Sequence, residues 1–159
     1  MRFDDWMLAL HVLSAFALVA GIIVFWALIV VGRRIDTPQA TLSLGPVARV
    51  GTATVGVGMV GTIVFGLWLA FSVGNYNIWD AWIVIALVLW VVGSALGRQT
   101  GQEYMKAPLK AVELQEAGQT GPNAELLELN RTSRGLLLQA LTSLVVLLII
   151  LDMIWKPWA

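Results

Sequence analysis

Four stretches of the chain are each apolar over about 20 residues, the length that a helix needs to cross the ~30 Å hydrocarbon core of a bilayer. Inside a bilayer the backbone N–H and C=O groups must bond within the protein, and a single segment achieves this only as a helix. We therefore expect an all-α fold, a polytopic membrane protein in which four transmembrane helices form one domain over residues 1–159. The expected spans cover about residues 6–31, 52–73, 79–96 and 135–155.

The composition excludes several classes of site. Hydrophobic residues make up 58% of the chain and charged residues 13%, which is too apolar for an ordinary soluble enzyme. Ten basic side chains balance ten acidic ones, so no basic excess indicates a nucleic-acid partner. Without cysteine the chain has no thiol catalysis, and its single histidine excludes sites that need two imidazoles. No nucleophilic serine or threonine stands beside a base, so the sequence favours a protein without catalytic activity of its own.

The basic residues are concentrated in two of the three connections. The connection at about 32–51 carries three of them and the connection at about 97–134 carries five, so together they hold eight of the ten. Connections rich in Lys and Arg remain in the cytoplasm. We therefore expect a multi-pass protein of the plasma membrane with both termini outside. Aromatic residues favour membrane boundaries, and six of them fall at the expected outer boundary: Trp6, Tyr76, Trp79, Trp82, Trp155 and Trp158.

The first basic connection contains a signal for a short helix. Thr37 can cap a helix that begins with Pro38, because proline at a first-turn position gives up no backbone hydrogen bond. The sequence therefore predicts a surface helix between Pro38 and Arg49, along the cytoplasmic interface of the membrane.

The second basic connection predicts a helical hairpin between the third and fourth spans. Acidic and basic residues follow Arg98 at roughly helical spacing until a turn at 118–122. Asn123 then starts a second helix, in which Glu128 can pair with Arg131, and we expect this helix to continue without a break into the fourth span. The hairpin is either a solvated connection that ties the two spans together or a docking surface for another protein.

Small residues recur every four positions on the second span and form a ridge along one helix face. Membrane helices associate through close backbone approach, which such a ridge permits. The ridge predicts either packing within the bundle or contact with a second copy or another membrane protein. A glycine-lined pore is not expected, because no ring of charged or hydroxyl side chains crosses the membrane. The predicted packing residues are Thr54, Gly58, Thr62, Gly66 and Ala70 on the second span, and Gly93 and Gly97 on the third.

His11 is the ionisable residue placed well inside an expected span, about 7 Å from its outer end at ~1.5 Å per residue. Met7 lies one helical turn away, and Asp152 and Met153 of the fourth span fall at a comparable depth. Three interpretations stay open. His11 hydrogen-bonds Asp152 or a backbone carbonyl across the bundle, or it binds a haem b as axial ligand. In the third, it holds copper together with Met7, Asp152 and Met153.

The two ends of the chain resemble a known family. The opening at 6–13 with its Leu-His pair, Gly21, the basic pair at 33–34 and the ending at 151–157, which contains Met-x-x-Lys-Pro, are similar to the bacterial four-helix membrane proteins grouped as DUF2269. That family implies no established activity. The Leu-His opening is also similar to that of CopD-type copper-resistance proteins and HemJ-type protoporphyrinogen oxidases. In the latter the early histidine is associated with haem, which implies a haem role for His11.

Two functions therefore remain open. The first is a small bacterial inner-membrane protein, surrounded by the lipid bilayer, that serves as an accessory or interaction subunit through its small-residue ridges and charged hairpin. The second is a haem b-binding membrane protein in electron transfer or tetrapyrrole chemistry, with His11 as axial ligand. The visible spectrum of the purified protein distinguishes the two.

Overall fold

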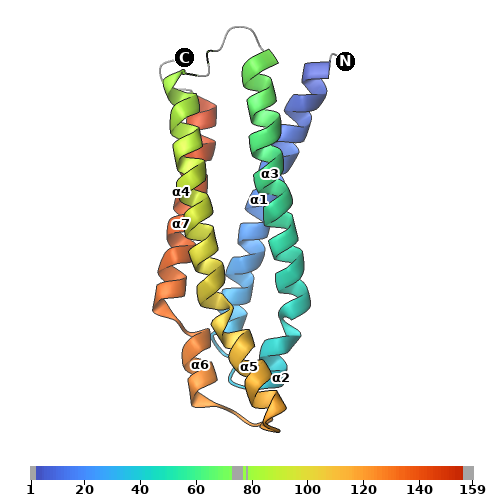
Figure 1. Ribbon diagram of the computed structural model, residues 1–159, viewed down its shortest axis with the longest axis vertical. Helices are drawn as coiled ribbons and strands as arrows, with labels where there is room; N and C mark the ends of the chain where they lie inside the picture. Colours follow the sequence, from blue (N-terminus) through green and yellow to red (C-terminus); the bar gives the residue numbers. More distant parts are fainter. Residues whose placement is uncertain (1–2, 73–76, 78, 156–159) are drawn as a thin grey trace.

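The computed structural model describes residues 3–72, 77 and 79–155. Four long helices stand side by side along the long axis of the molecule, and three short helices gather at one end (Figure 1). The long helices are α1 (Phe3–Gly32), α3 (Gly45–Ser72), α4 (Ala81–Tyr104) and α7 (Ser133–Trp155), and the short ones are α2 (Pro38–Ser43), α5 (Lys106–Glu116) and α6 (Ala124–Asn130). The described residues contain no strand, so the expected all-α fold is confirmed.

The surface of the bundle is apolar between its two ends. We call the end that holds α2, α5 and α6 the basic end, and the end where α1 begins and α7 finishes the terminal end (Figure 1). Each long helix lies in a stretch that is long and apolar enough to cross a membrane. Phe16 of α1 and Val60 of α3 are 67% and 62% exposed, as suits an exterior that faces lipid. The predicted four-helix membrane bundle is therefore confirmed.

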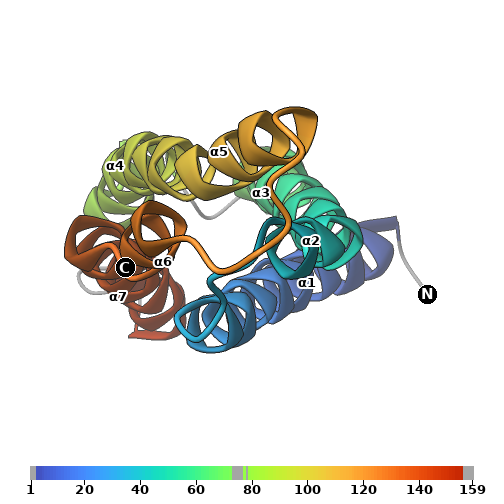
Figure 2. The same ribbon diagram turned by 90° about the horizontal axis from the view of Figure 1, so that it is seen from below.

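The long helices form two antiparallel pairs, α1 with α3 and α4 with α7. Seen along the bundle axis, the two pairs lie on opposite sides of the molecule (Figure 2). Contacts between the pairs are sparse along the middle, where Trp26 of α1 donates a hydrogen bond from Nε1 to Oγ of Ser143 in α7, 3.0 Å away. At the terminal end, Ala70 of α3 is buried with Trp82 and Ile83 of α4.

Proline sets two helix boundaries at the basic end. Pro46 lies in the first turn of α3 and Pro108 in the first turn of α5. Proline has no N–H to donate, and its ring collides with the carbonyl four residues earlier, so it interrupts the preceding helix and fits the start of a new one. The short helix predicted after Thr37 is confirmed as α2, with Pro38 in its first turn.

The predicted helical hairpin is formed by α5 and α6. After α5, Gly118 has a φ of 73°, in the left-handed region that favours glycine. Asn123 then caps α6, because its side-chain oxygen accepts a hydrogen bond from the backbone N–H of Leu126 at 3.0 Å.

The prediction that the helix after Asn123 continues into the fourth span is wrong, since α6 and α7 are separate helices. The hydroxyl of Thr132 accepts a hydrogen bond from the backbone N–H of Gly135 at 3.2 Å and so begins a new helix. Among the described residues no ion pair joins Glu128 to Arg131. Arg131 instead bonds to the backbone after α1.

Candidate functional site

Glycines of α3 let the backbone of α1 approach closely. A Cβ on Gly58 would lie 2.5 Å from the backbone N of Leu18, and a Cβ on Gly66 would lie 2.9 Å from Cε1 of His11. Carbon atoms in contact are ordinarily about 3.5–4.0 Å apart, so neither position has room for a side chain. The predicted residues Gly58 and Gly66 therefore face α1, as does Gly61, which lies against Ser14.

The other predicted packing residues lie in varied surroundings. Thr54 and Thr62 each donate their hydroxyl to the carbonyl one turn earlier on α3. Ala70 is buried against α4. On α4, a Cβ on Gly93 would lie 3.2 Å from Val145 of α7, whereas a Cβ on Gly97 would meet no atom within 4 Å. Of the predicted residues on α3, Gly58 and Gly66 thus contact α1, and Ala70 contacts α4.

His11 is half-buried in the α1–α3 interface. Its Nδ1 lies 3.0 Å from the carbonyl oxygen of Thr62. A carbonyl oxygen only accepts hydrogen bonds, so we assign the proton to Nδ1 and the lone pair to Nε2. Nε2 makes no hydrogen bond to any residue that the structure describes. One bond therefore orients the imidazole and leaves the second nitrogen available as a ligand.

The residues predicted to accompany His11 lie in separate environments. Met153 packs on the buried cluster of the terminal end, and Oδ2 of Asp152 is buried without a hydrogen-bond partner among the described residues. Met7 is half-buried on α1, one turn from His11. No hydrogen bond joins His11 to Asp152, and the described part of the chain brings no three His, Cys, Asp or Glu side chains together for a metal.

Hydrogen bonds that side chains donate join the two helix pairs at the basic end. Arg131 donates from Nε to the carbonyl of Arg33 at 2.9 Å, and Arg33 donates from Nη1 to the carbonyl of Arg131 at 3.3 Å. Asn130 donates from Nδ2 to the carbonyl of Ile35 at 3.0 Å and to the hydroxyl of Thr41 at 3.3 Å. We call these four bonds the basic-end clasp. They tie the α1–α2 connection to the α6–α7 connection.

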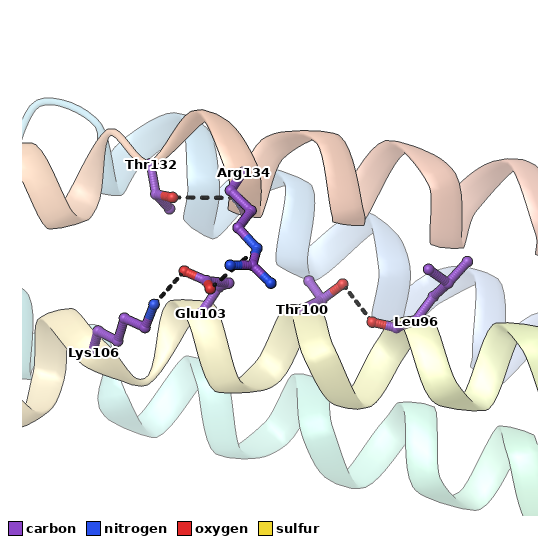
Figure 3. A network of polar contacts seen from close by, with 7 residues as sticks. Leu96, Thr100, Glu103, Lys106, Thr132 and Arg134 are labelled. Carbon is purple, nitrogen blue, oxygen red and sulfur yellow. Dashed lines mark hydrogen bonds and ion pairs between the residues drawn. The ribbon is translucent and has the colours of Figure 1, made fainter.

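Ion pairs add further links between helices at the same end. Lys110 of α5 lies 3.2 Å from Glu125 of α6. Glu103 of α4 lies 2.7 Å from Lys106 and 3.5 Å from Arg134 of α7 (Figure 3). Exposed pairs of this kind each stabilise a protein by ~1 kcal/mol or less. Their main effect here is to define which helices meet.

A cleft of about 730 Å³ opens beside these ion pairs. Its walls come from the end of α4, the start of α5, α6 and the α6–α7 connection. Acidic and basic side chains both line the cleft. The acidic ones are Glu103, Glu125 and Glu128, and the basic ones are Lys106 and Arg131. The mixture favours neither a strongly anionic nor a strongly cationic ligand.

The hairpin also presents an apolar face to the outside. Met105, Leu109 and Val112 follow one another at helical spacing and are 54%, 63% and 42% exposed. The opposite face of α5, centred on the fully buried Ala111, packs on α2 and α6. We call Met105, Leu109 and Val112 the α5 stripe. The spacing of these three residues is the sequence signal that could have revealed it.

Comparison of the chain with family models, with curated proteins and with solved structures gives no match. The likeness to DUF2269, CopD-type and HemJ-type proteins therefore stays a prediction from the sequence.

Proposed function

We propose that the protein is a multi-pass protein of the bacterial inner membrane, with its basic end in the cytoplasm and both termini outside. Eight of its ten Lys and Arg residues fall in the connections at 32–51 and 97–134, which the bundle gathers at one end (Figure 1). A concentration of basic residues marks the cytoplasmic side of membrane proteins. The resemblance to DUF2269 supports the same location.

Reporter fusions test this orientation. A reporter that is active only outside the cytoplasm should give a signal when fused after Ala159. A reporter that is active only in the cytoplasm should give a signal when inserted near Gly118. A cytoplasmic signal from the fusion at Ala159 would overturn the orientation.

Within this orientation the protein acts as an accessory or interaction subunit without catalytic activity of its own. The observation that carries this proposal is the α5 stripe. It begins beyond Arg98, the basic residue that follows the expected third span, so its three large apolar side chains lie on the cytoplasmic side. Apolar area exposed to water costs about 25 cal/mol per Å². A protein partner that covers the α5 stripe removes that cost.

The size of the complex in native membranes tests the interaction. Leu109→Gln should leave the melting temperature unchanged, because Leu109 is 63% exposed, and it should shift the protein to a smaller species on a native gel. Gln115→Ala on the exposed surface of the same helix is the matched control and should not shift it. If wild type and Leu109→Gln migrate alike, the α5 stripe is not an interaction surface.

A second candidate function is haem b binding in electron transfer or tetrapyrrole chemistry, and one observation favours it. Histidine ligands usually donate their other ring N–H to a carbonyl or carboxylate, which orients the ring. The carbonyl of Thr62 does this for Nδ1 of His11, so Nε2 fits the role of an axial ligand. Bound haem would supply one-electron redox chemistry. Copper has weaker support, because the described residues supply a single imidazole and bring no three His, Cys, Asp or Glu side chains together.

The visible spectrum separates the two candidates. Purified protein should show no Soret band, with or without added haem, if it is an interaction subunit alone. A Soret band in the protein as isolated would replace the leading proposal with the haem-binding one.

A further inference from the structure

The part of the α4–α7 interface next to the basic end is lined by polar side chains. Thr100 and Gln139 are 7% and 3% exposed, so both are almost fully buried. Among the described residues, the hydrogen bond found for Gln139 is at its backbone carbonyl, which accepts from Ser143, and the buried hydroxyl of Tyr104 has no partner. Buried amides and hydroxyls nearly always have hydrogen-bond partners. These two groups therefore point to a bound molecule.

Two contacts place these groups beside one another. The ring of Tyr104 packs on Gly135, where a Cβ would lie 2.9 Å from Cζ, and the hydroxyl oxygens of Thr100 and Thr142 are 3.4 Å apart. The two helices are antiparallel, and Gln139 lies one turn after Gly135 on the same face of α7. Gln139 therefore falls between the two contacts. We call Thr100, Tyr104, Gln139 and Thr142 the polar seam.

The hydroxyl groups of the two threonines can accept further hydrogen bonds but have no hydrogen left to donate. Thr100 donates its hydroxyl to the carbonyl of Leu96 and Thr142 donates to the carbonyl of Leu138, both at 2.8 Å. Each hydroxyl hydrogen is thereby used, but each oxygen keeps lone pairs that can accept. The free donors of the polar seam are the amide of Gln139 and the phenol of Tyr104. The seam thus suits a small neutral molecule that both donates and accepts.

The cleft at the basic end adjoins the polar seam. Glu103 and Thr132 both line the cleft. Glu103 precedes Tyr104 on α4. Thr132 accepts a hydrogen bond from the backbone N–H of Gly135, the residue on which Tyr104 packs. Figure 3 shows Glu103 and Arg134 between the two helices, one turn from Thr100. The polar groups therefore continue from the open cleft into the interface.

We propose that the polar seam is a binding site for water, which enters from the cleft past the ion pair of Glu103 and Arg134. Water is small, neutral, and able to donate and to accept, which is the chemistry that the seam requires. Bridging waters satisfy the amide of Gln139 and the hydroxyl of Tyr104. The bundle then has a hydrated pocket at the basic end, between α4 and α7. This inference does not depend on the function proposed above.

Cysteine reactivity tests the hydration directly, because the natural chain has no cysteine. A water-soluble methanethiosulfonate reagent modifies thiolates, which form in contact with water. Gln139→Cys should react more than tenfold faster than Leu137→Cys, whose side chain faces outward and is 60% exposed on the apolar surface. Leu137 lies two residues nearer the basic end, so depth alone would favour the control. A ratio of the two reaction rates below tenfold overturns the proposal. If Gln139→Cys does not fold, Thr142→Cys takes its place in the same comparison.

A second variant gives an independent answer. Gln139→Met removes the amide while it keeps nearly the same side-chain length. If bound water satisfies Gln139, this change should lower the melting temperature, because the water loses a partner. In a dry interface the change would remove an unpaired polar group and raise the melting temperature, which would contradict the proposal.

Discussion

The two helix pairs are built differently, although each consists of two antiparallel helices of membrane length. α1 and α3 meet through glycines, so that backbone packs on backbone and side chain, as at Gly58 against Leu18 and at Gly21 against Val55. α4 and α7 meet mainly through side chains, with Val145 buried and the polar seam nearer the basic end. In the first interface the two helices lie so close together that no further atoms fit between them. The second has polar groups that can bind a molecule.

The two helix pairs contact each other mainly at the two ends of the bundle. The basic-end clasp joins them on one side, and the cluster around Trp82 joins them on the other. Between these ends, the hydrogen bond from Trp26 to Ser143 links α1 to α7. We therefore expect substitutions within a pair to affect stability more than substitutions between pairs.

The largest effect should come from filling the glycine contact of the first pair. Gly58→Leu places atoms where the backbone of Leu18 lies. The backbone cannot move aside to relieve this overpacking, which therefore costs about 3 kcal/mol or more. Leu147→Ile on α7, where the side chain is 51% exposed, should change stability by less than ~0.5 kcal/mol. Thermal melts in detergent measure both. Equal melting temperatures would show that the glycine face is not a packing face.

A smaller loss should follow from opening the basic-end clasp. Asn130→Ala removes two hydrogen bonds between the pairs, at a cost of about 1–2 kcal/mol for part-buried groups. Gln119→Ala, in the exposed turn after α5, is the control and should be neutral. Denaturant titration of the two variants provides the comparison. If both unfold at the same midpoint, the clasp does not couple the pairs.

His11→Gln should cost ~1 kcal/mol or less, because the carboxamide keeps a donor for the carbonyl of Thr62. We expect a folded protein whose visible spectrum equals that of the wild type. This outcome agrees with a structural role for His11 in the first pair. A Soret band that is present in the wild type and lost in His11→Gln would instead identify His11 as a haem ligand.

The smallest effect concerns the ion pairs of the hairpin. Lys110→Met removes the contacts with Glu113 and Glu125, which contribute little to stability and weaken as salt is added. Arg98→Met serves as control, because Arg98 is exposed and makes no ion pair with the residues that the structure describes. Melting temperatures at low and high salt should converge for Lys110→Met and the wild type. A difference that persists at 1 M salt would contradict a surface electrostatic origin.

The features that could be predicted from the sequence are those with local causes. Four long apolar stretches predicted the membrane helices, and Pro38 predicted the start of α2. Asn123 predicted the start of α6, since its own side chain makes the capping bond. Each of these signals lies within a few residues of the structure that it produces.

The features that were missed depend on residues far apart in the chain. The break before α7 accompanies the bonds of Arg131 with Arg33, almost one hundred residues away, besides the local cap of Thr132 on Gly135. The glycine contact was expected every four residues. In the structure Gly58 and Gly66 of that spacing face α1, and so do Gly51 and Gly61, which lie outside it. The carbonyl partner of His11 likewise depends on the register of α1 against α3.

Close backbone approach holds the first pair together, and two alanine substitutions on α3 test this most directly. Alanine favours a helix over glycine by ~1 kcal/mol. A Cβ on Gly56 meets no neighbouring atom within 4 Å, whereas a Cβ on Gly58 meets the backbone of Leu18 at 2.5 Å. Thermal melts should therefore show a raised melting temperature for Gly56→Ala and a lowered one for Gly58→Ala. A shift in the same direction for both variants would contradict the claim.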